Sequence, residues 1–404
     1  MKIAIIKETK TPTDNRTPFT PDQCKILIEK YNMLIKIQPS NLRCFRDEEY
    51  ETVGCEISEN IHDCDFLFGI KEVAKAHLIP NKTYFIFSHT KKKQVHNQNL
   101  IRAFIDKKIT VIDYECLVHK DGSRILGFGT WAGIVGAHNG LLHFGKRNNL
   151  YTLTPAHQCK DFAALKNKYK GFILPPIKIA VTGNGRVAQG IIEIMTLLNI
   201  PKVCKLDYIQ KKYDHAVYVH ISGETLYVHK EKNNYNREDF HAHPTHYRNL
   251  FMDIAPYTDI LMNGVYWDKN IPRLFDTNDV SQSNWNIFTI ADISCDEQGS
   301  VPICIISTTI ANPVFGYHRY RHEPCAPYQK DSIDMMTIDN LPNELPRDAS
   351  TYFGNKLIEY IIPELSKEKS ELLQKATITI DGHLGTYFEY LQDYVDSALA
   401  PNQI

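Results

Sequence analysis

Short apolar runs alternate with helix-like segments through the first 120 residues of the chain. Residues 2–7 have the composition of a strand, and later apolar runs occupy 34–37, 65–69, 83–87 and 109–112. Helical patterns between these runs predict helices at 21–31, 47–53 and 97–106. Short apolar strands that alternate with helices are typical of a parallel, doubly wound sheet.

A strand, a glycine turn and a helix follow one another at residues 177–200. Gly183, Gly185 and Ala188 have the spacing G-x-G-x-x-A, and apolar residues then recur at helical intervals. Gly183 allows a tight turn, Gly185 leaves room for a pyrophosphate, and a helix N-terminus favours an anion. Glycine turns also join strands to helices for steric reasons alone, but this context favours dinucleotide binding. The predicted dinucleotide cradle comprises Gly183, Gly185, Arg186, Val187 and Ala188.

A glycine-rich helix is predicted at residues 128–144, where glycines recur at steps of four, three and four. This spacing places them on one helical face and favours close helix packing over a direct ligand contact. The next segment, 146–176, is polar and irregular. Further strands are predicted at 203–206, 258–265 and 287–293 and at one ending with Thr337-Ile338, with a hairpin at 216–228 and helices at 346–365 and 387–398.

Composition restricts the classes of function. A chain of 404 residues has room for two or three domains. The net charge of −1 argues against nucleic-acid or anionic-membrane partners, and no apolar run approaches the ~18 residues of a membrane span. Ten cysteines without a secretory leader predict reduced thiols and a cytoplasmic location. The sequence indicates no oligomeric state.

Reactive residues follow several apolar strands of the first half. Arg16 lies after the first strand, Lys71 and Glu72 after the run at 65–69, and His89 after the run at 83–87. The carboxyl ends of parallel strands are where ligands bind, so these side chains form a candidate site. A lysine whose pKa is lowered by desolvation can transfer protons near neutrality. Solvent exposure is the alternative explanation for each residue alone.

Other candidate residues are more dispersed. Glu115 follows a strand, and the guanidinium of Arg124 suits a substrate carboxylate, with a surface ion pair as the alternative. In the second half, Asp292, Asp339 and Asn340 lie at strand ends and either line a cofactor cleft or cap helices. His241, His243 and His246 match no standard zinc spacing, so no metal site is predicted.

Four segments together resemble the lysine–2-oxoglutarate reductase (saccharopine dehydrogenase, lysine-forming) family, within the alanine dehydrogenase and transhydrogenase superfamily. They are Val181–Gly190, Asp253–Thr258, Asn263–Trp267 and Ile338–Ser350. The resemblance covers nearly the whole chain. It implies an α/β enzyme with two Rossmann-like, doubly wound parallel-sheet domains and a cleft between them. Residues 1–130 and 345–404 would form the substrate domain, and 131–344 the dinucleotide-binding domain.

The resemblance implies condensation of lysine with 2-oxoglutarate and reduction of the imine to saccharopine by NAD or NADP chemistry. Lys71 and His89 match the family's catalytic pair, and Arg16 and Arg124 its carboxylate-binding arginines. Glu72 and Glu115 match acidic neighbours that tune the lysine and the histidine. The family counterpart of residues 239–247 binds no metal.

Two questions stay open in the sequence. NAD-preferring domains place an acidic residue on the ribose about twenty residues after the first glycine, where this chain has Lys205 and Asp207. Both NAD and NADP therefore remain candidates. An alanine dehydrogenase-like enzyme and a non-catalytic NAD-binding relative are the alternative functions. The combination of Lys71, His89 and Arg16 with the glycine turn argues against the second.

Overall fold

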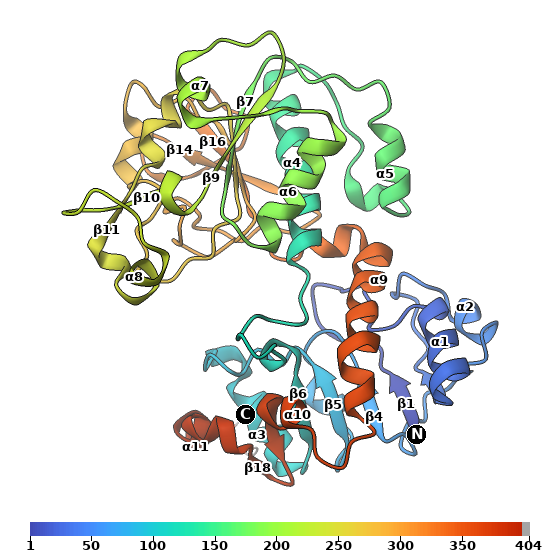
Figure 1. Cartoon of the computed structure of the whole chain (residues 1–404). Coiled ribbons are helices and arrows are strands. Elements are labelled where there is room, and N and C mark those ends of the chain that lie inside the picture. Colours follow the sequence, from blue (N-terminus) through green and yellow to red (C-terminus); the bar gives the residue numbers. More distant parts are fainter. Residues whose placement is uncertain (398–404) are drawn as a thin grey trace. The chain divides into compact units, whose positions relative to one another are not determined.

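The computed structural model describes residues 1–397. It divides into two compact units, one formed by Met1–Gly127 with the segment from Pro346 onward, the other by Phe128–Leu345 (Figure 1). Each unit contains an eight-stranded sheet. The α/β class with two doubly wound, mostly parallel sheets, predicted from the sequence, is confirmed.

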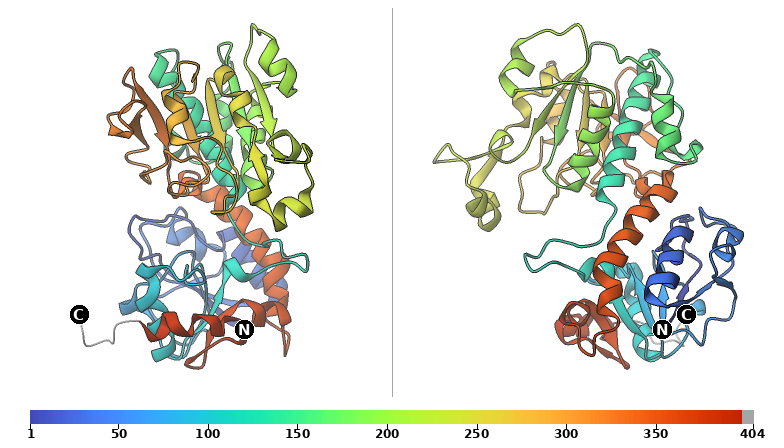
Figure 2. Two further views of the ribbon diagram at one scale, coloured as in Figure 1. Left: turned by 90° about the vertical axis from the view of Figure 1, so that its left-hand side faces the viewer. Right: turned by 45° about the vertical axis from the view of Figure 1, so that its right-hand side comes forward.

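The sheet of the first unit has the order β18-β17-β6-β5-β4-β1-β2-β3. Six of its strands are parallel, and the C-terminal pair β17–β18 joins antiparallel to β6. The strands are β1 (Lys2–Ile5), β2 (Leu34–Ile37), β3 (Glu56–Ile57), β4 (Phe66–Phe68), β5 (Thr83–Ile86), β6 (Thr110–Asp113), β17 (Thr377–Ile380) and β18 (His383–Leu384). The C-terminal strands therefore complete the sheet that β1 begins, and Figure 2 shows the red C-terminal segment beside the blue and cyan N-terminal part.

Helices surround this sheet: α1 (Pro21–Tyr31), α2 (Asp47–Glu51), α3 (Gln98–Asp106), α9 (Pro346–Lys356), α10 (Glu371–Ala376) and α11 (Gln392–Asp396). The start of α1 is fixed by a capping box, in which Thr20 and Gln23 satisfy one another's backbone N–H groups. Gln23 also donates to the Thr351 carbonyl oxygen (2.8 Å), which joins α1 to α9.

The sheet of the second unit has the order β15-β14-β16-β13-β12-β7-β9-β8. Its strands are β7 (Lys178–Thr182), β8 (Lys202–Val203), β9 (Val217–Ile221), β12 (Ile260–Asn263), β13 (Thr289–Asp292), β14 (Val314–His318), β15 (Glu323–Cys325) and β16 (Ser332–Met336). Neighbouring strands from β16 to β8 pair in parallel, and β14 pairs antiparallel with both β16 and β15. A separate antiparallel pair consists of β10 (Tyr227–His229) and β11 (Tyr247–Asn249).

The helices of the second unit are α4 (Gly129–Asn148), α5 (Phe162–Lys168), α6 (Arg186–Leu197), α7 (Lys205–Gln210) and α8 (Arg237–Ala242). Two glycines, Gly133 of α4 and Gly190 of α6, let these helices touch. A Cβ on Gly133 would lie 2.0 Å from the Val187 carbonyl oxygen, and one on Gly190 would lie 2.1 Å from the Thr130 carbonyl oxygen. The prediction that the glycine-rich helix serves close packing is confirmed.

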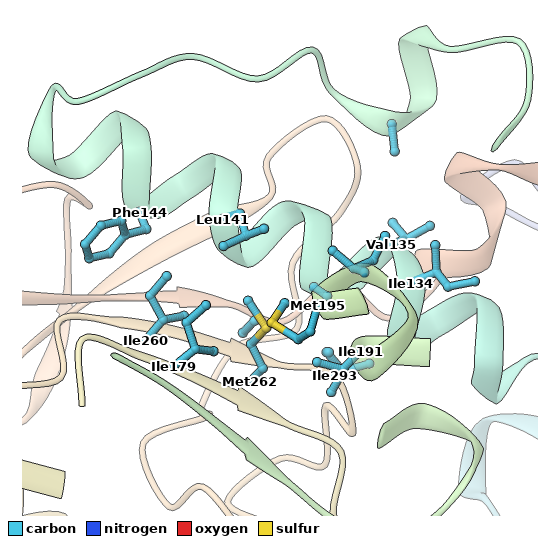
Figure 3. Packing of buried hydrophobic residues seen from close by; sticks show 14 of the residues in the cluster. Ile134, Val135, Leu141, Phe144, Ile179, Ile191, Met195, Ile260, Met262 and Ile293 are labelled. Carbon is cyan, nitrogen blue, oxygen red and sulfur yellow. The ribbon is translucent and has the colours of Figure 1, made fainter. Parts of the chain in front are cut away.

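The hydrophobic core under α4 and α6 fills the space between these helices and the sheet (Figure 3). Leu141 of α4, Met195 of α6 and Met262 of β12 meet there, and none is exposed to solvent. This packing fixes α6, and with it the glycine turn that precedes α6, against the carboxyl ends of the strands.

Several element predictions were wrong. Residues 216–228 form no hairpin, because β9 pairs in parallel with β7 and β8 while β10 pairs with β11. The strand expected at 203–206 ends at Val203, and α7 begins at Lys205. The irregular segment 146–176 contains α5. The last predicted helix is a 3₁₀ helix (Thr386–Leu391) followed by α11, and Ala398 lies outside the described residues.

Two further expectations concern the surroundings of the protein. No helix within residues 1–397 has the length and apolar character needed to cross a bilayer. The ten cysteines all lie in that range as free thiols. The cytoplasmic location stays a prediction.

Candidate functional site

The first candidate site lies in the first unit, where β1, β4 and β5 end. These strands are parallel, so the residues that follow them, Glu8, Lys71, Glu72 and His89, come from the same edge of the sheet. Backbone hydrogen bonds continue past the strands, for example from Phe87 N–H to the Ile70 carbonyl oxygen at 2.9 Å. The loops that carry these side chains are therefore held in register with the sheet.

His89 and Glu72 form the most direct contact of this site. His89 Nδ1 lies 2.7 Å from Glu72 Oε1, and because an ionised carboxylate only accepts hydrogen bonds, Nδ1 is the donor. The His89 backbone has a φ of 49°, a left-handed conformation that is unusual outside glycine and common at functional sites. Within residues 1–397 no partner contacts Nε2, so the ring is oriented for proton transfer at that nitrogen.

Glu72 is 8% exposed and is the centre of a small polar network. Lys10 Nζ binds its carboxylate at 2.9 Å, and the Asn97 amide donates to it at 3.2 Å. Burial alone would raise the pKa of Glu72, but the hydrogen bond from His89 and the cations around it hold that pKa well below its usual range. Glu72 therefore stays ionised and fixes the His89 ring.

Glu8 holds the turn that carries Lys71. Its carboxylate accepts hydrogen bonds from the backbone N–H groups of Ile70 (2.7 Å) and Lys71 (2.9 Å). Burial and the charge of Asp14 raise the pKa of Glu8 to about 7, although both N–H donors and Arg16 oppose that rise. Glu8 is thus an acid that titrates near neutrality directly beneath the predicted catalytic lysine.

Arg16 is buried and already engaged by a carboxylate. Its Nε and Nη2 atoms bind the two oxygens of Asp14 at 2.9 and 2.5 Å, and both side chains are almost fully buried. Burial would raise the pKa of Asp14, but Arg16 and the nearby Lys71 charge bring it to about 2. A substrate carboxylate at Arg16 would therefore join an existing ion pair.

Arg124 and Glu115 form a second, more exposed pair. Arg124 Nη2 lies 2.9 Å from Glu115 Oε1, and the Arg124 side chain is 44% exposed. The arginine sits in a loop closed by a bridge between Val118 and Arg124. The structure thus brings Glu72 to His89 and joins Glu115 to Arg124.

Three residues of this site were not predicted from the sequence: Glu8, Lys10 and Asp14. All three lie in the loop after β1, whose strand ends at Ile5 and not at residue 7. The rule that ligands bind where parallel strands end would have drawn attention to Glu8 had the strand boundary been correct. The contact of Lys10 with Glu72 spans 62 residues and has no local signal.

We expect Glu8→Gln to change how stability depends on pH. The folded protein holds a proton on Glu8 up to about pH 7, whereas the unfolded chain loses it near 4.5, so stability falls as pH rises across that window. Removing this titration changes the free energy of unfolding by up to about 3 kcal/mol at high pH. Urea unfolding between pH 4.5 and 8 should show a flatter profile for the variant.

The matched control is Glu59→Gln, because Glu59 pairs with Lys7 on the same unit but is 62% exposed. Its profile should follow that of the unchanged protein. Parallel profiles for Glu8→Gln and the unchanged protein would contradict the raised pKa of Glu8.

The second candidate site is the dinucleotide cradle of the second unit. Gly183 has a φ of 98°, and a Cβ there would lie 2.4 Å from the Gly264 carbonyl oxygen, so the turn requires glycine. Gly185 immediately precedes α6, and a Cβ built on it meets no atom within 4 Å. The space above Gly185 and the first N–H groups of α6 therefore suit a pyrophosphate.

Neighbouring strands hold the cradle in place. His220 of β9 contacts the Gly183 carbonyl oxygen through Nε2 at 2.6 Å, and Gly264 N–H donates to the Thr182 carbonyl oxygen at 3.1 Å. Ala188 is 1% exposed and lies in the first turn of α6. Arg186 and Val187 form the first turn of α6.

Asp292 ends β13 at the same edge of the sheet. Its Oδ1 accepts hydrogen bonds from Asn263 (2.8 Å) and Ser294 (2.8 Å), while Oδ2 is buried and has no partner among residues 1–397. Burial raises the pKa of Asp292 despite these donors. A buried, unsatisfied carboxylate oxygen at a strand end marks a place that a ligand donor can complete. Asp339 and Asn340 follow β16 at this edge.

The structure corrects the expected ribose position. Lys205 and Asp207 lie on α7 after the edge strand β8, and β9 separates β8 from β7. Both side chains form ion pairs with other residues: Lys205 with Asp253 and Asp207 with Lys211, each at 2.9 Å. The five-residue apolar β9 takes the inner position because the two-residue β8 has too little apolar surface to fill it. Glu224 is exposed and follows β9, the strand that neighbours β7 in the sheet.

The three histidines at 241–246 belong to the region around α8. The rings of His243 and His246 stack with centroids 5.2 Å apart. No group of three or more His, Cys, Asp or Glu side chains in residues 1–397 has a geometry that suits a metal ion.

Comparison with known proteins agrees with this arrangement. Residues 4–135 match the family model of the alanine dehydrogenase/PNT N-terminal domain. The alpha-aminoadipic semialdehyde synthase of Arabidopsis thaliana is 30% identical over 96% of this chain and 41% of its own length. The mitochondrial enzyme of that name from Rattus norvegicus is 29% identical over 98% of this chain and 48% of its own length. The chain spans about half the length of these relatives.

A relative of matching length is the saccharopine dehydrogenase [NAD(+), L-lysine-forming] of Yarrowia lipolytica, 23% identical over 95% of this chain and 98% of that protein. Among solved structures, L-alanine dehydrogenase superposes with a TM-score of 0.65 at 14% identity, covering 98% of this chain and all of the other. The transhydrogenase from Sinorhizobium meliloti gives 0.59 at 12% identity, covering 95% and 98% of the two chains.

Proposed function

We propose that this chain is a member of the alanine dehydrogenase and transhydrogenase superfamily and a nicotinamide-dependent oxidoreductase acting on lysine, 2-oxoglutarate and saccharopine. It forms saccharopine by reductive condensation or runs the reverse oxidation. The observation that carries the proposal is the His89–Glu72 pair on the strand-end loops that also present Lys71. That group of side chains can move protons, which a protein that only binds a dinucleotide does not need.

The chemistry requires proton transfers at two stages. The side-chain amine of lysine attacks the keto carbon of 2-oxoglutarate, and loss of water gives an imine. Lys71 and His89 Nε2 deliver and remove the protons of addition and dehydration, while Glu72 keeps the His89 ring oriented. When bound, the reduced nicotinamide supplies the hydride that reduces the imine carbon.

Arg16 and Arg124 hold the substrate carboxylates in this proposal. The product saccharopine carries three carboxylates, so more than one cationic anchor is needed. Arg16 lies in the loop after β1, and Arg124 lies in the loop that follows β6, so the two anchors come from different strand ends. The exposed Arg124 is accessible to a carboxylate, and Arg16 offers a position stabilised by Asp14.

The cradle would hold the cofactor through Gly183, Gly185 and the first turn of α6. The buried Asp292 oxygen and the strand-end residues Asp339 and Asn340 would complete the site. We propose NAD in preference to NADP, because the exposed Glu224 follows β9, the strand beside the glycine turn. An acidic residue there accepts a hydrogen bond from a ribose hydroxyl and repels a 2′-phosphate.

We expect oxidation of NADH by the purified protein with lysine plus 2-oxoglutarate. Arg16→Ala and Arg124→Ala should each raise KM for at least one substrate by about 10-fold or more, because a charge-assisted carboxylate contact is lost. The assay includes pyruvate with ammonia, and each pair is tested with NADH and NADPH.

Turnover of pyruvate with ammonia and none with lysine plus 2-oxoglutarate would replace this proposal by an alanine dehydrogenase-like activity. Nucleotide binding without turnover of either pair would identify a non-catalytic relative.

A further inference from the structure

A trough of about 650 Å³ lies in the second unit outside the dinucleotide cradle. One wall is formed by β11 and the residues that precede it, and the other by the loop after β12, from Trp267 to Asp276. The buried side chains of Tyr247, Leu274 and Phe275 form its floor. None of the residues of the dinucleotide cradle lines it.

Four basic side chains line this trough, Lys230, Arg248, Lys269 and Arg273. Lys230 donates to the Thr245 carbonyl oxygen and Arg273 to the Gln298 carbonyl oxygen, each at 2.8 Å. Because a carbonyl group has no net charge, these hydrogen bonds leave the positive charges of Lys230 and Arg273 uncompensated. Among the described residues, no acidic side chain forms an ion pair with any of the four.

The two acidic residues of the trough are occupied locally. Asp279 accepts one hydrogen bond from the Asp276 backbone N–H and another from the Gln282 side chain, each at 2.7 Å. Asp276 in turn accepts from the Asp279 backbone N–H in a capping box of the 3₁₀ helix Thr277–Ser281. Both carboxylates keep their charge, but the four basic side chains outnumber them, so the trough has an excess of positive charge.

Trp267 adds a flat aromatic surface to the basic trough. Its Nε1 donates to the Ile271 carbonyl oxygen at 3.0 Å, which fixes the ring, and the Arg273 guanidinium lies 5.7 Å from the ring centroid. An indole ring held in this way stacks on planar heterocycles, and the neighbouring arginine suits phosphate groups.

We propose that this trough is a second binding site, for a nucleoside polyphosphate. The phosphates contact Arg248, Lys269 and the other two cations, and the base lies on Trp267. Two features favour this class over simple carboxylates: the number of uncompensated cations and the ring beside them. The site is independent of the proposed oxidoreductase activity, because it shares no residue with the dinucleotide cradle or the strand-end site of the first unit.

The test is calorimetric titration of the full chain with GTP, chosen because an adenine nucleotide also fits a dinucleotide cradle. We expect GTP to bind about 10-fold more weakly to the double variant Arg248→Glu, Lys269→Glu than to the unchanged protein. The control double variant Lys168→Glu, Lys170→Glu alters exposed lysines of the same unit outside the trough and should bind normally. Trp267→Ala should weaken GTP and leave inorganic tripolyphosphate unchanged.

Three results would overturn the proposal. Absence of GTP binding, or equal binding by the Arg248→Glu, Lys269→Glu variant, would exclude the trough as a nucleotide site. Loss of GTP binding in Gly185→Val would assign that binding to the dinucleotide cradle. Retained GTP binding in Gly185→Val, together with lost NADH binding, supports two separate sites.

Discussion

Lys71→Met is expected to lower kcat about 100-fold or more, the usual worth of a positioned proton-transfer group. The variant removes the amine but leaves the Lys71 backbone N–H, so its hydrogen bond to Glu8 remains and the turn should keep its shape. Steady-state rates with saturating substrates measure the effect, and thermal unfolding should change little.

The control for this variant is Lys75→Met, four residues along the same loop, where the lysine is exposed. Its kcat should equal that of the unchanged protein. An unchanged kcat in Lys71→Met would assign the proton transfer to another group, of which His89 is the first candidate. The variant His89→Gln tests the contribution of His89 separately from that of Lys71, because glutamine has no basic nitrogen in place of Nε2.

Gly185→Val is expected to abolish NADH binding without loss of stability. The added side chain enters the open space before α6, where it meets no atom of the protein but occupies the place of the pyrophosphate. Calorimetric titration with NADH measures binding, and the midpoint of thermal unfolding measures stability.

Gly190→Val provides the opposite case. Its side chain would collide with the Thr130 carbonyl oxygen and separate α4 from α6, so the unfolding midpoint should fall sharply.

NADH affinity close to normal in Gly185→Val would remove the cofactor assignment from this turn.

Local patterns predicted the parts of the structure that depend on nearby residues. The turn at Gly183 and the glycine face of α4 each follow from spacing over a few residues. The strand-end rule also placed Lys71, Glu72 and His89 on one edge of the sheet. The carboxyl ends of parallel strands lie at the same edge whatever the order of the strands.

Features that depend on distant pairing were not predictable in this way. The exchange of β8 and β9 in the sheet order is decided by which strand buries more apolar surface against β7, and no local motif records it. The sequence pattern therefore pointed to Lys205 and Asp207 for the ribose, whereas we propose Glu224. Lys10 and Glu72, which are in contact, lie 62 residues apart in the sequence. Asp14 is a polar loop residue near Arg16, and nothing in the local sequence distinguishes it as the partner of that arginine.

The divided first unit has a consequence for synthesis on the ribosome. The second unit is one continuous stretch, so all its strands are available once residue 345 has emerged. The sheet formed by residues 1–127 is completed later, because β17, which covers the sheet edge at β6, is synthesised after the whole second unit. Until then, β6 is an open edge strand, which invites pairing with other chains. Truncation before Thr377 should therefore yield a product whose second unit folds while its first unit aggregates.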